Sequence, residues 1–391
     1  MKEGWETKTL AEVCSVITDG THQTPKYFDS GFIFLSSKNV TSGKIDWTNV
    51  KFLDEAQHLA LSKRLKPQLN DILLAKNGTT GVAAIVDKDE VFDIYVSLAL
   101  LRPDPTIDPY LLLHFINSPA AKSQFNKRLK GIGVPNLHLK EIREVEFSYP
   151  VDRRAQQVIV EVLDKAFAAI DQAKANLEQN IANAQELFQS KLNQIFSQKG
   201  EGWVETSLGE IGKVSMCKRI LKRQTSPSGD IPFFKIGTFG KAPNAYIPRD
   251  IYEEFRRKYS FPKKGDILIS ASGTIGRRVV YDGEPAYFQD SNIVWIDNDE
   301  KLILNDYLYQ FYGACDWNPS KGATISRLYN DDLRRIRISF PSLSEQKAQT
   351  EIVAKLSKHI EESITAYQTK LAALDELKKS ILQKAFAGEL T

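Results

Sequence analysis

Cysteine is scarce in this chain, and long apolar runs are missing from it. Cys14, Cys217 and Cys315 are the three cysteines among 391 residues, and their odd number and wide spacing indicate reduced thiols rather than a disulfide framework. Since about 18 consecutive apolar residues occur nowhere, we expect no membrane-spanning helix and no membrane partner. The N-terminal segment also lacks the apolar core of a signal peptide, which predicts a cytoplasmic protein.

Sequence signatures of catalysis and of metal binding are also missing. The five histidines are scattered, and no His or Cys stands at the spacing of zinc ligands. The sequence contains no Gly-x-Ser-x-Gly nucleophile elbow, no Walker A loop and no Asn-Pro-Pro-Tyr/Phe or glycine motif of a methyltransferase. We therefore expect a chain without catalytic residues, without a metal site and without a cofactor.

Charge of one sign is nearly absent, because 52 basic residues face 49 acidic ones. Residues 201–341 hold 21 basic and 18 acidic side chains, whereas residues 1–150, 151–200 and 342–391 are each balanced. A net charge of +3 is weak evidence for a polyanionic partner. Any such preference belongs to residues 201–341.

The chain repeats itself once. Several sets of residues recur in the same order, at offsets between 190 and 198. Gly4-Trp5 recurs as Gly202-Trp203, and Glu186-Leu187 recurs as Glu376-Leu377. Asp71 to Leu74 with Gly78 to Gly81 recurs as Asp266 to Ile269 with Gly273 to Gly276, and Leu137 with Pro150 recurs as Leu328 with Pro341. Such a period decides the architecture, and it predicts a pseudo-two-fold tandem repeat of units of about 195 residues.

Each repeat divides into a globular part and a helical part. The globular part has short apolar runs separated by Gly, Asn and Asp, which predict strands, and stretches such as 109–115 and 306–312 predict helices, so we expect an α/β (α+β) domain. Residues 153–196 and 343–387 contain neither Pro nor Gly. Their apolar residues recur every three to four positions over about four heptads, which is typical of a coiled coil.

Neither long helix can bury its apolar stripe alone, so we expect the two helices to pack against each other. The predicted boundaries are 1–150 and 201–341 for the globular domains and 151–200 and 342–391 for the helices. The outward helix faces could also bind partner helices. Phe196 and Phe386 recur near the two helix C-termini and are the candidate partner-binding residues. Alignment of the two copies also predicts about one additional turn in the second helix, at residues 347–349.

This order of domains and helices resembles, over the whole chain, the specificity (S) subunit of Type I restriction–modification enzymes. The resemblance is carried by the paired Gly-Trp starts, by the two Gly-rich turns, by Ser344-Glu345-Gln346 and by the C-terminal run 382–390. One departure is Arg154-Ala155-Gln156, where the family usually has Glu at the position of Ala155.

The resemblance implies that each globular part is a target recognition domain for one half of a split, asymmetric double-stranded DNA target. It implies that the helices form an antiparallel coiled coil that sets the spacer and docks two methyltransferase (M) subunits. Restriction/translocase (R) subunits would complete the assembly. S-adenosylmethionine would belong to the M subunits, and ATP and Mg to the R subunits, so this chain would be a non-catalytic recognition subunit without a cofactor.

Two alternatives stay open from the sequence. One is the specificity subunit of a related system in which methyltransferase and nuclease are fused in one partner. The other is a coiled-coil adapter whose globular domains bind protein instead of DNA. Strong salt dependence of duplex binding would distinguish both DNA-binding interpretations from the adapter, because phosphate contacts release counterions.

The Gly-rich turns have two interpretations. Their small residues could let backbone N–H groups approach a phosphate, while a flanking Lys76 or Arg277 supplies charge. Equally, the glycines could serve a strand-connecting turn that needs positive φ. The polar loops of each copy contain Arg, Lys, Asn and Gln, the residues that read guanine and adenine edges, although solvated loops have the same composition. Among them, the cluster 218–223 is favoured because it concentrates the excess positive charge.

The candidate DNA-binding residues are Thr21, His22, Gln23, Lys38, Asn39, Lys76, Asn77, Thr79, Lys130, Asn136 and His138 in the first copy, and Lys218, Arg219, Lys222, Arg223, Lys235, Thr238, Ser272, Thr274, Arg277, Arg278, Lys321, Arg327 and Tyr329 in the second.

Overall fold

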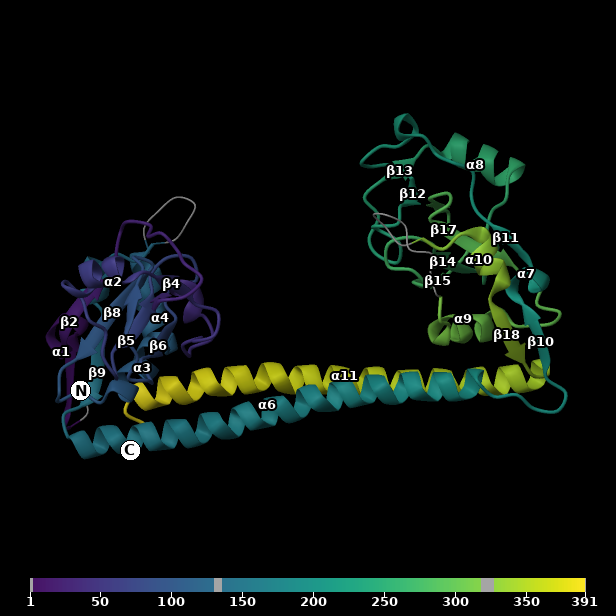
Figure 1. Cartoon of the computed structure of the whole chain (residues 1–391). Helices are drawn as coiled ribbons and strands as arrows, with labels where there is room; N and C mark the ends of the chain where they lie inside the picture. Colours follow the sequence, from purple (N-terminus) through teal and green to yellow (C-terminus); the bar gives the residue numbers. More distant parts are fainter. Residues whose placement is uncertain (1–2, 130–135, 318–326, 391) are drawn as a thin grey trace. The chain divides into compact units, whose positions relative to one another are not determined.

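The computed structural model describes residues 3–129, 136–317 and 327–390. The chain divides into two compact units, Met1–Leu177 with Gln368–Thr391, and Glu178–Tyr367. Each unit holds one globular domain together with parts of two long helices, as the colours in Figure 1 allow the reader to follow.

The first domain is built from two small sheets and a strand pair. The four-stranded sheet has the order β2 (Cys14–Asp19), β8 (Leu98–Pro103), β5 (Ile72–Ala75) and β6 (Ala83–Ile85), and all its pairs are antiparallel. The three-stranded sheet has the order β4 (Lys51–Leu53), β3 (Phe32–Leu35) and β7 (Phe92–Ile94), with β3 and β7 parallel. The strand pair is β1 (Trp5–Thr9) with β9 (Glu146–Pro150). The helices are α1 (Leu10–Val13), α2 (Glu55–Ser62), α3 (Pro109–Ile116), α4 (Pro119–Arg128) and α5 (Leu139–Arg143), with the 3-10 turn η1 (Ser37–Asn39).

Strand β5 explains why this domain needs two cores. All four of its residues are buried, and successive side chains of a strand point to opposite faces of the sheet. Ile72 and Leu74 therefore pack in the core that α3 covers, while Leu73 and Ala75 pack in the core shared with β7. The continuous apolar run in the sequence is the signature of a strand covered on both faces.

The second domain repeats this topology. Its four-stranded sheet has the order β11 (Lys213–Ser215), β17 (Ile293–Asp297), β14 (Ile267–Ser270) and β15 (Arg278–Val280). Its three-stranded sheet has the order β13 (Tyr246–Ile247), β12 (Ile231–Phe234) and β16 (Tyr287–Phe288), and β10 (Val204–Ser207) pairs with β18 (Arg337–Phe340). The helices are α7 (Leu208–Ile211), α8 (Arg249–Lys258), α9 (Asn305–Ala314) and α10 (Asn330–Arg335), with the 3-10 turn η2 (Lys222–Gln224). The predicted duplication and the mixed α/β class are thus confirmed in both copies.

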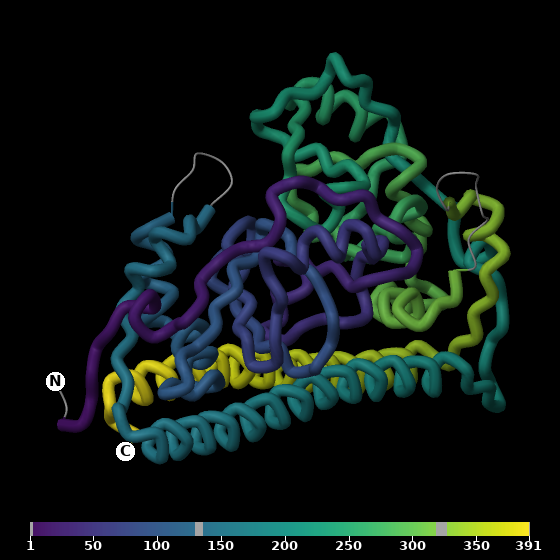
Figure 2. The backbone as a smooth tube through the Cα atoms, turned by 60° about the vertical axis from the view of Figure 1, so that its left-hand side comes forward, coloured from purple at the N-terminus to yellow at the C-terminus, as the bar shows by residue number. Residues whose placement is uncertain are grey.

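The two long helices are α6 (Arg153–Phe196) and α11 (Leu343–Phe386), and each has 44 residues. In the first unit, Lys174 forms an ion pair with Asp375, and Lys378 lies 3.6 Å from Asp171. Rising numbers on α6 therefore meet falling numbers on α11, so the two segments run antiparallel there, and Figure 2 shows the same two segments side by side. The additional turn predicted at residues 347–349 is wrong, because both helices have the same length.

Phe196 and Phe386 anchor the long helices to the globular domains. Phe386 is 9% exposed and lies 5.4 Å from Phe115, ring to ring, in the first core. Phe196 is half-buried, and its ring lies 5.0 Å from Tyr307 on α9. The prediction that these rings bind partner helices is corrected for Phe386, since almost none of its surface is accessible. For Phe196 it stays a prediction, although the ring contacts Tyr307 and Phe311 of its own domain.

Among the helices of the described residues, none is long and apolar enough to cross a membrane.

Candidate nucleic-acid interface

In each domain, a Gly-rich turn follows strand β5 or β14 and pairs with the segment just before helix α5 or α10. Asn77 forms a β-bridge with Asn136 in the first domain, and Ser272 forms one with Arg327 in the second. The backbone N–H of Leu137 donates to the Lys76 carbonyl at 2.9 Å, and the same bond is repeated in the second copy between Leu328 and Ala271. The fold thus places segments some 55 to 60 residues apart in the sequence at one end of each four-stranded sheet.

The glycines of these turns have a backbone role. Gly78 and Gly81 have φ values of 75° and 78°, and Gly273 and Gly276 have 67° and 81°. These values lie in the left-handed region of φ, which residues other than glycine rarely adopt. The turn geometry therefore explains all four glycines, and phosphate binding by these turns stays a prediction.

The polar loop of the first domain joins the same end of the sheet. Thr21 forms a parallel bridge with Tyr95, just before β8. Ser97, two residues further along, accepts a bond from the Lys76 N–H at 3.0 Å through its carbonyl and one from the Ser37 N–H at 3.0 Å through its hydroxyl. The segments that hold Thr21 to Gln23, Lys38 and Lys76 to Thr79 are thereby brought together around residues 95–97.

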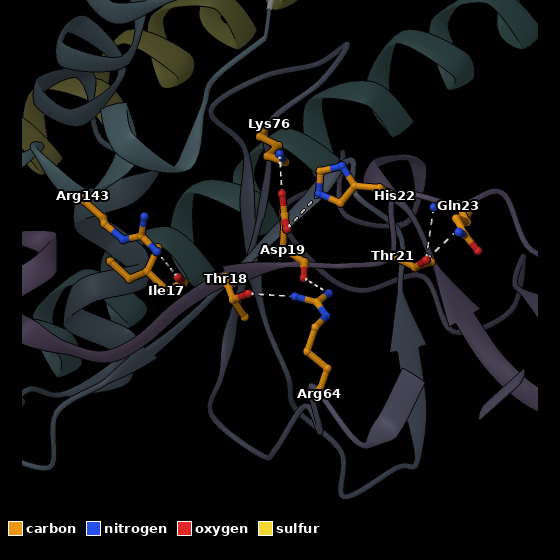
Figure 3. Close-up of polar contacts among 9 residues, drawn as sticks. All are labelled: Ile17, Thr18, Asp19, Thr21, His22, Gln23, Arg64, Lys76 and Arg143. Atoms are coloured by element: carbon orange, nitrogen blue, oxygen red, sulfur yellow. Dashed lines mark hydrogen bonds and ion pairs between the residues drawn. The ribbon is translucent and has the colours of Figure 1, made fainter. Parts of the chain in front are cut away.

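Lys76 is not available to a phosphate, which corrects its predicted role. Its side chain is 6% exposed, and Nζ donates to Asp19 Oδ2 at 2.8 Å. The other carboxylate oxygen, Oδ1, lies 3.4 Å from Nε2 of His22, whose side chain is 73% exposed. Figure 3 shows Lys76 and His22 on either side of the Asp19 carboxylate.

Asn39 is also a structural residue and not a DNA contact. It is 6% exposed. Its Oδ1 accepts from the Ser36 N–H at 2.9 Å, and its Nδ2 donates to the carbonyls of Asp46 and Asn49. The amide group of Asn39 therefore stabilises η1 and the turn that follows it. The neighbouring Lys38 is exposed.

The first loop of the second domain carries four exposed cations. Lys218, Arg219, Lys222 and Arg223 are all exposed. Lys218 Nζ lies 4.8 Å from the centre of the Tyr259 ring, and Arg219 Nε donates to Asp290 at 2.8 Å. Both contacts restrict a long side chain while its charged group stays at the surface.

Three further candidates of the second domain have partners within the domain. Arg277 is half-buried and donates to the Phe239 carbonyl at 2.9 Å. Ser272 is 9% exposed, and its hydroxyl donates to Asn292. Arg327 donates to the Ser291 carbonyl at 3.0 Å, with its guanidinium 5.9 Å from the exposed Tyr329 ring.

Arg278 faces the helix layer, which corrects its predicted DNA-binding role. Its guanidinium lies 4.3 Å from the centre of the Tyr309 ring on α9. A Cβ atom at Gly313 would meet its NH1 atom at 1.8 Å, so the absence of a side chain at Gly313 makes room for the arginine. The equivalent place in the first domain is filled by Asn117, which exchanges two hydrogen bonds with the backbone of Ala83.

The other candidates are placed without a test of their function. Gln23, Thr79, His138, Lys235 and Thr274 are exposed, and Thr238 caps a turn by accepting the Lys235 N–H at 3.1 Å. Lys130 and Lys321 lie outside the described residues. Asp19, Arg64 and Arg143 were not among the candidates predicted from the sequence. No local motif marks these residues, and their contacts join segments that lie far apart in the sequence. Within the described ranges, no group of three or more His, Cys, Asp or Glu could hold a metal.

The comparisons with known proteins match this duplicated architecture. A family model described as "Type I restriction modification DNA specificity domain" matches residues 2–183 and again residues 200–376. The chain belongs to this family. The two matches make it a Type I specificity subunit with two recognition domains.

Two relatives illustrate the range of similarity. The chain is 64% identical over 148 residues to a putative type I restriction enzyme specificity subunit of Haemophilus influenzae, a match that spans 38% of each protein. It is 24% identical over 429 aligned positions to the StySPI specificity subunit of Salmonella potsdam, covering 100% of this chain and 90% of that relative.

Two solved structures share the fold. A chain from a study of complex assembly and conformational transition in a type I R-M system has a TM-score of 0.78 at 19% identity, covering 100% of this chain and 99% of that one. The HsdS subunit of Thermoanaerobacter tengcongensis has a TM-score of 0.61 at 19% identity, with coverage of 100% and 98%. At this identity the similarity concerns the fold alone.

Proposed function

We propose that this specificity subunit reads a bipartite, asymmetric DNA target, with one half assigned to each recognition domain. The observation that carries the proposal is the duplicated surface. In both domains the loop after β2 or β11, the Gly-rich turn and the segment before α5 or α10 converge at the same end of the sheet. The side chains at this place differ between the copies, for example His22 in one and Arg219 in the other, so the two half-sites are expected to differ.

In this proposal the chain recognises DNA and transfers no group itself. Phosphate contacts position a protein on the duplex, whereas contacts with base edges carry the sequence information. The exposed Lys and Arg of the loop 218–223 suit phosphate contacts. Methylation would be carried out by two M subunits that bind S-adenosylmethionine, and translocation and cleavage by R subunits that use ATP and Mg. The paired long helices would set the spacer and dock the M subunits.

The test is methylome sequencing of a host that expresses this chain with its methyltransferase partner. We expect one bipartite motif with an unspecified spacer. Replacing the first recognition domain by that of another specificity subunit should change one half of the motif and leave the other half as it was. A methylome in which both halves change, or in which no motif depends on this chain, would contradict the proposal.

Duplex binding separates the proposed function from a protein-binding adapter. The assembled complex should bind its target duplex with an affinity whose logarithm falls linearly with the logarithm of salt concentration. Absence of specific duplex binding at low salt would favour the adapter. A scrambled duplex of equal length serves as the control for sequence-independent binding.

A further inference from the structure

The end of strand β2 is held by three cationic side chains from three different parts of the first domain. Arg143 of α5 donates to the Ile17 carbonyl at 2.7 Å. Arg64, which follows α2, donates to the Asp19 carbonyl at 2.6 Å, and Lys76 donates to the Asp19 carboxylate at 2.8 Å. Figure 3 shows Arg143 and Arg64 reaching this short stretch of backbone and Lys76 reaching the Asp19 carboxylate, immediately before the loop that carries His22.

The loop itself is also fixed at its start. The Thr21 N–H donates to the Ile94 carbonyl, and the Val96 N–H donates to the Thr21 carbonyl, both at 3.0 Å. A side chain at Gly20 would place its Cβ 1.9 Å from the Ile94 oxygen, so the two segments approach as closely as glycine permits. His22 therefore projects from a rigid base, although its own side chain is 73% exposed.

The second domain folds the same sheet without this ion pair. Strands β5 and β14 have the same register against β8 and β17, and the residues that follow them are Lys76 and Ala271. By the register of β2 and β11, the residue equivalent to Asp19 is Met216. One chain thus contains both a buried ion pair and its apolar replacement at the same place in the fold.

This comparison argues against a purely structural role for the pair. A buried ion pair is often no more stabilising than apolar residues of similar volume, because desolvation offsets the attraction. What the pair does provide is a carboxylate in a fixed position. Asp19 Oδ1 is 3.4 Å from His22 Nε2, a long contact that orients the ring. In the second copy Met216 stands at the place of Asp19, and Arg219 donates instead to Asp290, which lies in a different segment.

We infer that Lys76 and Asp19 are positioning residues for His22, and that His22 reads an exocyclic amino group of adenine or cytosine in the first domain's half-site. In the Nε2–H tautomer, which donates to Asp19, Nδ1 is left as an acceptor, because the hydrogen bond of one ring nitrogen sets the role of the other. In the major groove, the amino groups of adenine and cytosine are the donors that such an acceptor can recognise. The inference rests on the proposed function.

The test compares His22→Ala with the double variant Asp19→Met/Lys76→Ala, which imports the second copy's residues. Each is assembled with the methyltransferase partner, and methylation rates are measured on duplexes that differ from the wild-type motif by one base pair. We expect both variants to lose about tenfold in discrimination at the same single A·T or G·C pair of the first half-site, the size of one good base contact. Discrimination in the second half-site should stay unchanged.

The matched control is Asp71→Asn/Arg102→Gln, which removes another buried ion pair of the first domain, at the opposite end of β5. It should leave discrimination at every position unchanged. The triple variant His22→Ala/Asp19→Met/Lys76→Ala should be no worse than His22→Ala at the affected pair, since the three residues act on one contact. Thermal unfolding and co-purification with the partner report whether each variant folds.

Several outcomes would overturn the inference. They are a His22→Ala variant that keeps full discrimination, a loss at different base pairs in the two variants, and an affected base pair at which an adenine or cytosine analogue without the amino group leaves the methylation rate of the duplex's target adenines unchanged. Because His22 is exposed, its variant decides the matter even if the double variant fails to fold. If the wild-type complex itself shows no motif, the proposed function fails, which is a separate result.

Discussion

Gln156 and Gln346 make the same three hydrogen bonds in two separate domains. Each is the fourth residue of a long helix and is fully buried. Oε1 of Gln156 accepts from the Asp108 N–H at 2.7 Å, and its Nε2 donates to the carbonyls of Thr106 and Pro150 at 3.1 and 3.0 Å. Oε1 of Gln346 likewise accepts from the Leu304 N–H at 2.9 Å, and its Nε2 donates to the carbonyls of Leu302 and Pro341 at 3.0 and 2.9 Å. The amide thus ties the first turn of each helix to the backbone of its own recognition domain.

Gln156→Leu should destabilise the first domain strongly, and Gln346→Leu the second. Leucine leaves one buried N–H and two carbonyls without partners, and an unsatisfied buried polar group costs about 1–3 kcal/mol. We expect each variant to lose about 3 kcal/mol or more in the free energy of unfolding, measured by urea denaturation. The adjacent Gln157 is exposed, so Gln157→Leu is the matched control and should stay within about 0.5 kcal/mol of the wild type.

The two long helices begin with different caps. In α11, Glu345 accepts from both the N–H and the hydroxyl of Ser342. In α6, the family's glutamate is replaced by Ala155, and the Asp152 carboxylate accepts from the N–H groups of Arg154 and Ala155 instead. The departure from the family pattern therefore changes which residue caps the helix and leaves the helix start in place.

Asp152→Ala and Glu345→Ala should each cost about 1 kcal/mol in unfolding free energy. Asp152→Ala leaves the N–H groups of Arg154 and Ala155 without a side-chain acceptor, and Glu345→Ala does the same to the N–H of Ser342, the residue before the helix. Ala155→Glu should give little gain, because the new carboxylate would stand near the one that already caps the helix. Urea denaturation measures all three. A gain of about 1 kcal/mol from Ala155→Glu would contradict this account of the cap.

The burial of His114 makes the stability of the first unit depend on pH. His114 is 14% exposed, and its Nε2 lies 2.9 Å from Asp164 Oδ1. Burial lowers the pKa of this histidine below its usual value, because the charged ring is poorly solvated, and the partly compensating Asp164 does not restore it. Below pH 6.5 the unfolded chain then binds more protons at this site than the folded one, so stability falls as pH falls.

His114→Gln should reduce this pH dependence. Glutamine is the natural residue at the equivalent place of α9, Gln310. Urea denaturation at pH 7.5 and 5.5 should show a smaller loss of stability in the variant than in the wild type. The exposed His359 provides the control, since His359→Gln should leave the difference between the two pH values unchanged. An undiminished difference in His114→Gln would show that other groups cause it.

Much of the fold could be predicted in detail because the sequence repeats itself and its long helices contain neither Pro nor Gly. The repeated Gly-Trp starts and Gly-rich turns gave the two units, and the absence of Pro and Gly from 153 to 196 gave the helix that the structure has as Arg153–Phe196. The predicted extra turn at 347–349 was wrong because it came from aligning apolar side chains. The buried Gln156 and Gln346 fix the register of the helices, and their spacing of 190 residues matches the equal helix lengths.

The candidate site was harder to predict because burial is not visible in a loop sequence. Lys76 beside Gly78 has the pattern of a phosphate-binding turn, yet its charge is neutralised by Asp19, 57 residues away in the sequence. The polar groups of Asn39 and Arg278 likewise contact other residues of the same domain, a backbone carbonyl for Asn39 and the Tyr309 ring for Arg278. The loop residues His22 and Lys218 remained exposed as expected, since loops at the end of a sheet carry few burying contacts.

Phe386→Ala should destabilise the first unit by about 3–5 kcal/mol, the usual cost of removing a buried aromatic ring. The ring is 9% exposed and contacts Phe115 and Phe147. We expect the variant that remains folded to bind the methyltransferase partner with unchanged affinity, measured by titration at low temperature. Gln383→Ala, an exposed change one helical turn away, is the control for stability. Weaker partner binding without any loss of stability would restore the partner-contact prediction.

Lys222→Gln and Arg223→Gln should weaken DNA binding without altering the sequence that is read. Both side chains are exposed on η2, in the region that holds the chain's excess of positive charge. Each lost phosphate contact should reduce the slope of log affinity against log salt by about 0.9, so the double variant should lose about two units of slope. Lys301, which pairs with Asp299 at 2.6 Å, is the control, and Lys301→Gln should leave the slope unchanged. If the double variant instead kept the slope and changed the methylated motif, these residues would be contacts with bases and not with phosphates.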